Sequence, residues 1–313
     1  MTITNPFQWH LDTNGYAIID GALATELQNR GCDLNDPLWS AKVLMEQPQL
    51  IEDVHYDYFV AGADCAITAS YQATPLGLAS KGCTLSESID LIKKSVQLAQ
   101  QAKERYLLNN PCNKELVIAG SVGPYGAFLA DGSEYTGDYS LSDEEIATFH
   151  HDRIQALIEA GIDIIAFETM PSFPEIKVLA NSIKQYNKPC WFTFTLKDHD
   201  HISDGTPLAT VINWLNSIEH VMMIGVNCIA LDSVTAALKT LSQYTNKPLI
   251  VYPNSGEHYD PDNKTWCIAT HRTLCEYADE WRQYGAQLIG GCCRTTPDDI
   301  KQLVNQLHEK KHP

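Results

Sequence analysis

The sequence has no run of about 20 uninterrupted apolar residues, which is the length that spans a bilayer. Its first ten residues, MTITNPFQWH, contain neither the basic segment nor the apolar run of a secretory signal peptide. We therefore expect a cytoplasmic protein with no membrane partner. In that compartment its ten cysteines are expected to be thiols or metal ligands rather than a disulfide framework.

Basic residues are also scarce. The chain has 22 Lys and Arg against 39 Asp and Glu, which gives a formal net charge of -17. This balance argues against a nucleic-acid partner, because neutralising phosphates requires clustered basic side chains. It favours a cationic substrate only weakly, because an acidic balance more often serves solubility.

Linkers, low-complexity tracts and charge blocks are absent as well, and 44% of the residues are hydrophobic. One domain covering residues 1–313 is therefore expected. Apolar, strand-like runs alternate with amphipathic helical patterns along it, and this alternation is typical of α/β proteins with a parallel sheet. The strands are expected at 16–20, 65–70, 116–121, 162–169, 190–196, 221–228, 248–254 and 286–293, and the helices at 41–61, 86–107, 142–160, 173–185, 207–217, 233–244, 270–284 and 297–308. Eight such units predict a single (β/α)₈ TIM-type barrel, with a doubly wound open sheet as the alternative.

Polar side chains collect where the expected strands end, which is where a barrel of this kind carries its chemistry. The candidates are Asp20, Gly21, Ser70, Ser121, Glu168, Asn227, Cys228, Asn254, Cys292 and Cys293. Small hydroxyls in such positions are often only loop caps, and an Asp before Gly is often only a turn former. For these residues both interpretations stay open.

Three cysteines stand out among these strand ends. Cys228 ends the sixth run, and Cys292 and Cys293 end the eighth after a glycine pair. Neighbouring side chains of a regular strand point to opposite faces, so the glycines are needed to let both thiols converge. Three thiolates would form an open tetrahedral Zn²⁺ site of the catalytic type. The other cysteines are interpreted as buried thiols, and a redox pair is disfavoured because the C-x-x-C spacing is missing.

Several segments together resemble one family. These are LIGGCCRTTPDDI with GVNC upstream, DGALATEL, ITASYQAT, GSVGPYGA, AFETMPS and YPNSGE, and they extend over nearly the whole chain. They resemble the homocysteine S-methyltransferases, which implies transfer of a methyl group to homocysteine to form methionine. The resemblance also implies that Zn²⁺ is held by Cys228, Cys292 and Cys293, that Glu168 binds the homocysteine ammonium, and that Asp20-Gly21 lies near its amino-acid head. The length and the YPNSGE segment resemble short members that use S-methylmethionine or S-adenosylmethionine.

Further residues have less specific assignments. Before substrate binds, water or the side chain of Asn254 is expected to occupy the open position of the metal. Glu257, Tyr259 and Trp266 follow the seventh strand and are candidates for holding a cationic donor, although aromatic packing explains them equally well. The run 198–201, Asp-His-Asp-His, is interpreted as a solvated loop rather than as a metal site.

Two competing functions remain at this stage. The first is a homocysteine methyltransferase that uses betaine or another donor, which the missing C-terminal extension disfavours. The second is a noncatalytic barrel whose cysteines hold structural zinc or sense redox state. The sequence leaves open the preferred donor, activity on selenocysteine and the oligomeric state.

Overall fold

The computed structural model describes residues 3–36, 38, 40–111, 113–260, 265–268 and 272–309, without the side chains of 257–260 and 265–268. Eight parallel strands form its central sheet. They are β1 (Ala17–Ile18), β2 (Cys65–Ile67), β3 (Val117–Val122), β4 (Ile164–Met170), β5 (Cys190–Phe194), β8 (Val221–Asn227), β9 (Leu249–Tyr252) and β12 (Ala286–Ile289). Among the described residues, no helix combines the length and the apolarity that crossing a membrane requires.

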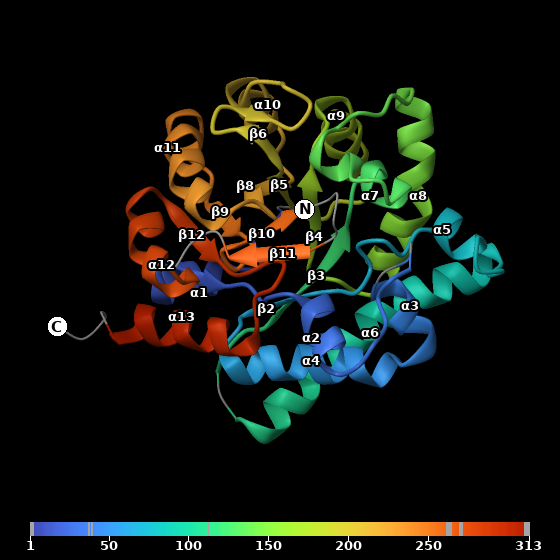
Figure 1. Cartoon of the computed structure of the whole chain (residues 1–313), viewed down its shortest axis with the longest axis horizontal. Helices are drawn as coiled ribbons and strands as arrows, with labels where there is room; N and C mark the ends of the chain where they lie inside the picture. The colour runs from blue at the N-terminus through green and yellow to red at the C-terminus, as the bar shows by residue number, and fades with distance from the viewer. Residues whose placement is uncertain are drawn as a thin grey trace.

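The sheet closes into a barrel. Its order is β1-β12-β9-β8-β5-β4-β3-β2, and the two end strands meet through a parallel bridge between Ile19 and Cys65. The backbone N–H of Asp20 also donates to the Cys65 carbonyl at 3.1 Å. Figure 1 shows the ring of strands with helices around it. The predicted eight-stranded barrel is confirmed, and the open-sheet alternative is wrong.

The helices pack around this ring. They are α1 (Gln8–Asn14), α2 (Leu23–Asn29), α3 (Ser40–Glu46), α4 (Pro48–Ala61), α5 (Pro75–Ala79), α6 (Leu85–Asn109), α7 (Tyr125–Leu129), α8 (Asp143–Glu159), α9 (Phe173–Ser182), α10 (Leu208–Asn216), α11 (Val234–Tyr244), α12 (Leu274–Gln283) and α13 (Pro297–Glu309), with 3₁₀ turns η1 (Ser133–Tyr135), η2 (Ile183–Gln185) and η3 (Leu231–Ser233). The helix expected at 41–61 is two helices, because Pro48 starts a new one and its ring cannot continue the first.

Two antiparallel hairpins were not expected from the sequence. One joins β6 (Leu196–Asp198) to β7 (His201–Ile202), and the other joins β10 (Glu257–Asp260) to β11 (Thr265–Ile268). The hairpins follow β5 and β9 at the carboxyl end of the barrel. Helix α1, also unexpected, brings Phe7 against Trp191 of the barrel interior, with ring centroids 6.3 Å apart.

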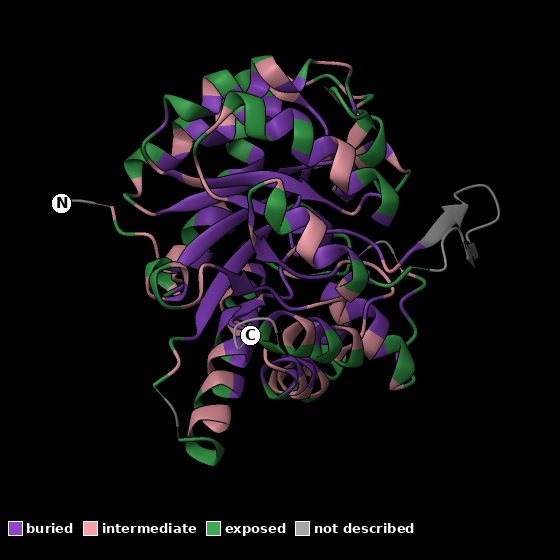
Figure 2. Ribbon diagram, turned by 90° about the vertical axis from the view of Figure 1, so that its left-hand side faces the viewer, coloured by how far each residue is buried: buried purple, intermediate pink, exposed green. Residues whose placement is uncertain are grey.

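The strands of the barrel are coloured as buried in Figure 2. Their apolar side chains form two layers, one inside the barrel and one against the helices. In β4, Ile164 and Ala166 belong to the barrel interior, whereas Ile165 and Phe167 face the helices. This two-residue period directs the next residue of the inner set, Glu168, into the barrel. The strand register therefore places a carboxylate at the carboxyl end of the interior.

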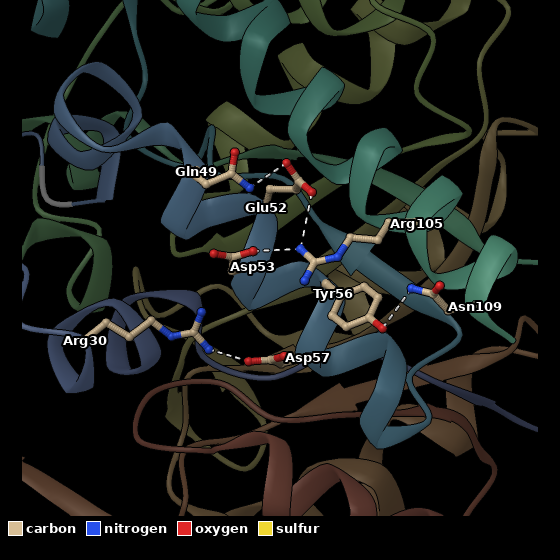
Figure 3. Close-up of polar contacts among 8 residues, drawn as sticks. All are labelled: Arg30, Gln49, Glu52, Asp53, Tyr56, Asp57, Arg105 and Asn109. Carbon is tan, nitrogen blue, oxygen red and sulfur yellow. Dashed lines mark hydrogen bonds and ion pairs between the residues drawn. The ribbon is translucent and has the colours of Figure 1, made fainter.

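The outer helical layer carries ion pairs at its surface. Figure 3 shows Arg105 of α6 paired with Asp53 of α4, at 2.7 Å. Its guanidinium carbon also lies 4.0 Å from the centre of the Tyr56 ring. Exposed pairs of this kind contribute about 0–1 kcal/mol each, so α4 and α6 are held mainly by buried apolar residues such as Val54 and Val96.

Candidate metal and substrate site

The three candidate cysteines meet at the carboxyl end of the barrel. Their sulfur atoms all lie within 4.8 Å of one another, and they form the group of potential metal ligands found in the described part of the chain. The Cys228 and Cys293 sulfurs are 3.8 Å apart. Cys228 and Cys292 are joined as a disulfide with their Cα atoms 5.6 Å apart. Because metal ligation needs thiolates, this pair must be reduced before it can hold an ion.

The loop of Cys292 is fixed by close packing. A Cβ atom on Gly291 would lie 2.3 Å from Thr295 Oγ1, so the position accepts only glycine. Thr295 Oγ1 donates to the Cys292 carbonyl at 2.6 Å and accepts from the Ala22 N–H at 3.2 Å. The φ angle of Gly291 is not positive, so this glycine is required for close approach rather than for unusual dihedrals. The predicted convergence of the thiols is present, but its cause differs from the expected one.

The loop of Cys228 stores backbone strain instead. Cys228 has φ 52° and Thr169 has φ 62°, a left-handed region that non-glycine residues seldom adopt. The Thr169 N–H donates to Asn227 Oδ1 at 2.8 Å, and Asn227 Nδ2 donates to Thr169 Oγ1 at 2.8 Å. The amide of Asn227 therefore holds the strained Thr169, and Asn227 directly precedes the strained Cys228 in the chain.

Glu168 lies at the centre of a buried polar network. Its Oε1 accepts a short hydrogen bond from Ser121 Oγ, and the carboxylate is also bonded by Tyr252. The Tyr252 hydroxyl is positioned by Trp191 Nε1 at 3.1 Å and by Thr193 Oγ1 at 2.8 Å. Burial raises the pKa of Glu168 to about 7, although both hydrogen bonds lower it. A cation placed beside this carboxylate would favour its charged form.

The other predicted strand-end residues surround Glu168. Asp20 is buried, its Oδ2 accepts from the Ile67 N–H at 2.9 Å, and burial followed by the Glu168 charge raises its pKa. Ser70 Oγ donates to the Ser121 carbonyl at 2.8 Å, which joins the ends of β2 and β3. Gly21 makes room for Tyr58, since a Cβ there would lie 2.8 Å from the phenol. The hydroxyl of Ser70 is thus engaged within the protein.

The donor set of the three cysteines fits a soft divalent cation. Burial raises the pKa of the Cys293 thiol to about 11, and the charges of Glu134 and Glu168 raise it further. Holding that sulfur as a thiolate near neutral pH requires a positive charge beside it, and Zn²⁺ prefers thiolate ligands. Asn254 Oδ1 is buried without a hydrogen-bond partner in the described chain, and the next residue, Ser255, bonds the Cys293 carbonyl. The residues present therefore fit the predicted zinc ion.

The predicted donor-binding residues and the run 198–201 are not part of the site described above. The side chains of Glu257, Tyr259 and Trp266 lie outside the described residues, so their expected role stays a prediction. Asp198 and His201 belong to the β6–β7 hairpin and pair with each other at 2.8 Å on the surface, which agrees with a solvated segment.

Sequence reasoning missed Tyr252, Thr169 and Thr295 as parts of the site. Tyr252 could have been found from the strand period, because it lies two residues after inward-facing Ile250. The strain at Thr169 left no signal in the sequence.

Comparisons with known proteins agree with this geometry. The profile of the family described as homocysteine S-methyltransferase matches residues 17–307. A homocysteine S-methyltransferase of Escherichia coli strain K12 is 54% identical, over 97% of this chain and 99% of the relative. The crystal structure of the E. coli homocysteine methyltransferase MmuM in its metallated form has a TM-score of 0.90 and 51% identity, and covers 96% of this chain and 100% of that one. The oxidized form of MmuM also has a TM-score of 0.90, with 52% identity over 97% of this chain and 100% of that one.

Proposed function

The chain belongs to the homocysteine S-methyltransferase family, and from this premise we propose that it moves a methyl group from a sulfonium donor to the thiolate of homocysteine. The observation that carries the proposal is the convergence of the Cys228, Cys292 and Cys293 sulfurs within 4.8 Å. These three side chains are the proposed ligands of Zn²⁺. Metal binding by a relative of 51% identity in its metallated form supports this assignment.

The cysteines prepare the site for the acceptor. A Zn²⁺ ion bound by three thiolates supplies an open position that favours the deprotonated form of a substrate thiol at neutral pH. The thiol proton leaves to solvent. The homocysteine sulfur then forms a bond to the methyl carbon as the bond from that carbon to the donor sulfur breaks. The electron pair of the broken bond stays on the donor sulfur, which becomes a neutral thioether.

Glu168 is proposed to orient homocysteine through its ammonium group. The carboxylate lies at the carboxyl end of β4, on the inner face of the barrel, and is held by Ser121 and Tyr252. A buried carboxylate with a pKa of about 7 gains a counter-ion when an ammonium binds beside it. Asp20 and Gly21 are proposed to lie near the same amino-acid head. Correct alignment of the acceptor can supply about 7–11 kcal/mol of such a displacement.

The remaining polar residues at the strand ends are proposed to act at different distances from the substrate. They are Asn254, Asn227, Ser70 and Ser121. Asn254 has an unpaired buried oxygen and remains the candidate for direct contact or for an oxygen ligand before substrate binds. The amide of Asn227 and the hydroxyls of Ser70 and Ser121 are engaged with protein groups. Their contribution is therefore proposed to be the positioning of Glu168 and Cys228.

The donor is proposed to be S-methylmethionine ahead of S-adenosylmethionine. Betaine is the competing donor, and a noncatalytic zinc barrel is the competing role. Reduced, zinc-loaded protein should be incubated with homocysteine and each donor in turn, with methionine measured by mass spectrometry. A labelled methyl group is needed for S-methylmethionine, because that reaction yields methionine from both substrates. No methionine from any donor, or much faster turnover with betaine, contradicts the proposal.

The domain organisation and the cellular location of the enzyme are also proposed. One folding unit over residues 1–313 is supported by the closed ring, in which the first and last strands are neighbours. A cytoplasmic location is supported by the need for three reduced cysteines, because the cytosol keeps thiols reduced. Gel filtration of limited-proteolysis products checks the first of these proposals.

A further inference from the structure

Glu134 lies over the carboxyl end of the barrel and has no role in the chemistry described above. It belongs to η1, in the segment that follows β3. Its backbone carbonyl accepts a hydrogen bond of 2.9 Å from Thr195 Oγ1, just after β5, and Ser203 Oγ donates to that same hydroxyl at 2.8 Å. The η1 turn also contacts β4, the strand of Glu168. The backbone of Glu134 is therefore fixed above the ends of β4 and β5.

No basic side chain of the described residues forms an ion pair with the carboxylate of Glu134. Its Oε2 atom is buried, yet no hydrogen-bond partner for it exists among the described residues. Buried carboxylate oxygens are normally paired because desolvating an unpaired charge is costly. A carboxylate with one buried, unpartnered oxygen therefore lies beside the carboxyl ends of β4, which carries Glu168, and of β5.

We propose that Glu134 binds the α-ammonium group of the sulfonium methyl donor, an inference that rests on the proposed function. Homocysteine occupies the inner position, since its sulfur goes to the cysteines and its ammonium to Glu168 inside the barrel. The donor must then reach that sulfur from the loop side of the site. Glu134 is a carboxylate of that side, and it is half-buried whereas Glu168 is buried.

The ammonium is the better partner than the sulfonium on energetic grounds. The sulfonium charge disappears as the methyl group is transferred, so a carboxylate beside it would stabilise the bound donor more than the transition state and would slow the reaction. The ammonium keeps its charge throughout. Contact with it strengthens donor binding without changing the barrier of the bound complex, so the Michaelis constant for the donor should depend on Glu134 and kcat should not.

The test is the variant Glu134→Gln, which keeps the shape of the side chain and removes its charge. With S-methylmethionine we expect the donor KM to rise roughly 10- to 100-fold, the range for loss of a charge-assisted hydrogen bond, with kcat and the homocysteine KM unchanged. Calorimetric titration of S-methylmethionine should show the same loss of affinity. Glu134→Asp should restore part of it. Glu144→Gln, which removes an equal charge from the exposed face of α8, is the matched control and should change neither constant.

A second donor separates the two cationic groups. Trimethylsulfonium keeps the reactive sulfur but has no ammonium, so wild type and Glu134→Gln should use it equally. An equal KM for S-methylmethionine in both proteins overturns the inference, and so does the same rise with trimethylsulfonium. A fall in kcat accompanied by a higher homocysteine KM indicates a structural role and also overturns it. Failure of the wild type with every sulfonium donor overturns the proposed function itself, and this inference with it.

Discussion

The side chains of Asn227 and Thr169 satisfy each other through two hydrogen bonds of 2.8 Å. Thr169 follows Glu168, Cys228 follows Asn227, and both Thr169 and Cys228 have positive φ angles. Each such conformation costs on the order of 1–3 kcal/mol and persists only where neighbouring contacts hold it. This pair therefore ties the position of the proposed substrate carboxylate to that of a proposed metal ligand.

Removing the hydrogen bonds between Asn227 and Thr169 tests whether they couple the position of Glu168 to that of Cys228. Asn227→Ala leaves the buried Thr169 N–H without a partner, so the free energy of unfolding should fall by about 1–3 kcal/mol. Zinc retention and homocysteine affinity should both weaken, because the two strained residues are released together. Urea unfolding, zinc analysis and steady-state kinetics measure these effects. Asn216→Ala removes two surface bonds, one of 2.7 Å to the Tyr244 carbonyl and one of 2.6 Å from Thr245 Oγ1, and should cost about 1 kcal/mol or less because both groups can bond water instead. Equal zinc retention in Asn227→Ala and wild type contradicts the link.

The charge of Glu168 should set homocysteine affinity. Glu168→Gln keeps the shape of the side chain but removes the charge, so acceptor binding should weaken by about 1.5–3 kcal/mol, seen as a higher homocysteine KM. The donor KM should stay unchanged, the reverse of the pattern expected for Glu134→Gln. An unaltered homocysteine KM and turnover show that Glu168 has another role.

The same carboxylate predicts a pH dependence. Its pKa of about 7 without substrate means that the charged, ammonium-binding form is lost as the pH falls through 7. Homocysteine affinity of wild type should therefore drop between pH 8 and pH 6 more than that of Glu168→Gln. The substrate thiol titrates in the same way with both proteins. The ratio of their homocysteine affinities therefore reports only the titration of the Glu168 carboxylate. A ratio that is constant over this range contradicts the prediction.

The barrel and its metal-binding residues could be predicted from the sequence because both leave periodic or chemical signals. Alternating apolar runs located every barrel strand, and Cys228, Cys292 and Cys293 stood at strand ends. Boundaries were less accurate. The eighth expected strand ends at Ile289 rather than at Cys293, because the chain leaves the sheet there: the Gly291 N–H bonds the Asp20 carbonyl after β1, and the Cys292 N–H bonds the Pro253 carbonyl after β9.

The roles of several side chains could not be predicted because they depend on tertiary contacts. Asn227 looked like a substrate ligand from its place at a strand end, yet its amide is engaged by Thr169. The close approach of Thr295 to Gly291 and the unpaired oxygen of Glu134 are likewise properties of packed loops. A residue type and a position in the chain do not reveal which neighbour uses a polar group.

A buried histidine away from the site predicts a pH-dependent stability. His55 of α4 is buried, neither ring nitrogen has a partner in the described chain, and burial lowers its pKa to about 4. Its unfolded value is about 6.5, so its contribution to stability is complete above that pH and is lost as the pH falls from 6.5 to 4. At pH 5 the loss relative to pH 8 should be about 2 kcal/mol.

The measurement compares urea unfolding of wild type and His55→Leu at pH 8 and pH 5, with chelator and reductant present so that metal binding does not contribute. The variant should lose less stability on acidification than wild type. His199→Leu, which replaces an exposed histidine of the surface run 198–201, is the control and should follow wild type. Parallel losses in wild type and His55→Leu would falsify the assignment of this pH dependence to His55.

Loss of one proposed metal ligand should separate chemistry from stability. Cys292→Ser should retain little zinc and almost no transfer activity, because a serine hydroxyl stays protonated near neutral pH and is a poor zinc ligand. The barrel should remain folded, since two continuous apolar layers rather than the metal hold it together. Plasma mass spectrometry of zinc, methionine formation and the melting temperature measure the three properties. Cys83→Ser, at a half-buried free thiol, should match wild type in all three. Normal turnover by reduced Cys292→Ser would mean that the acceptor thiol is activated elsewhere.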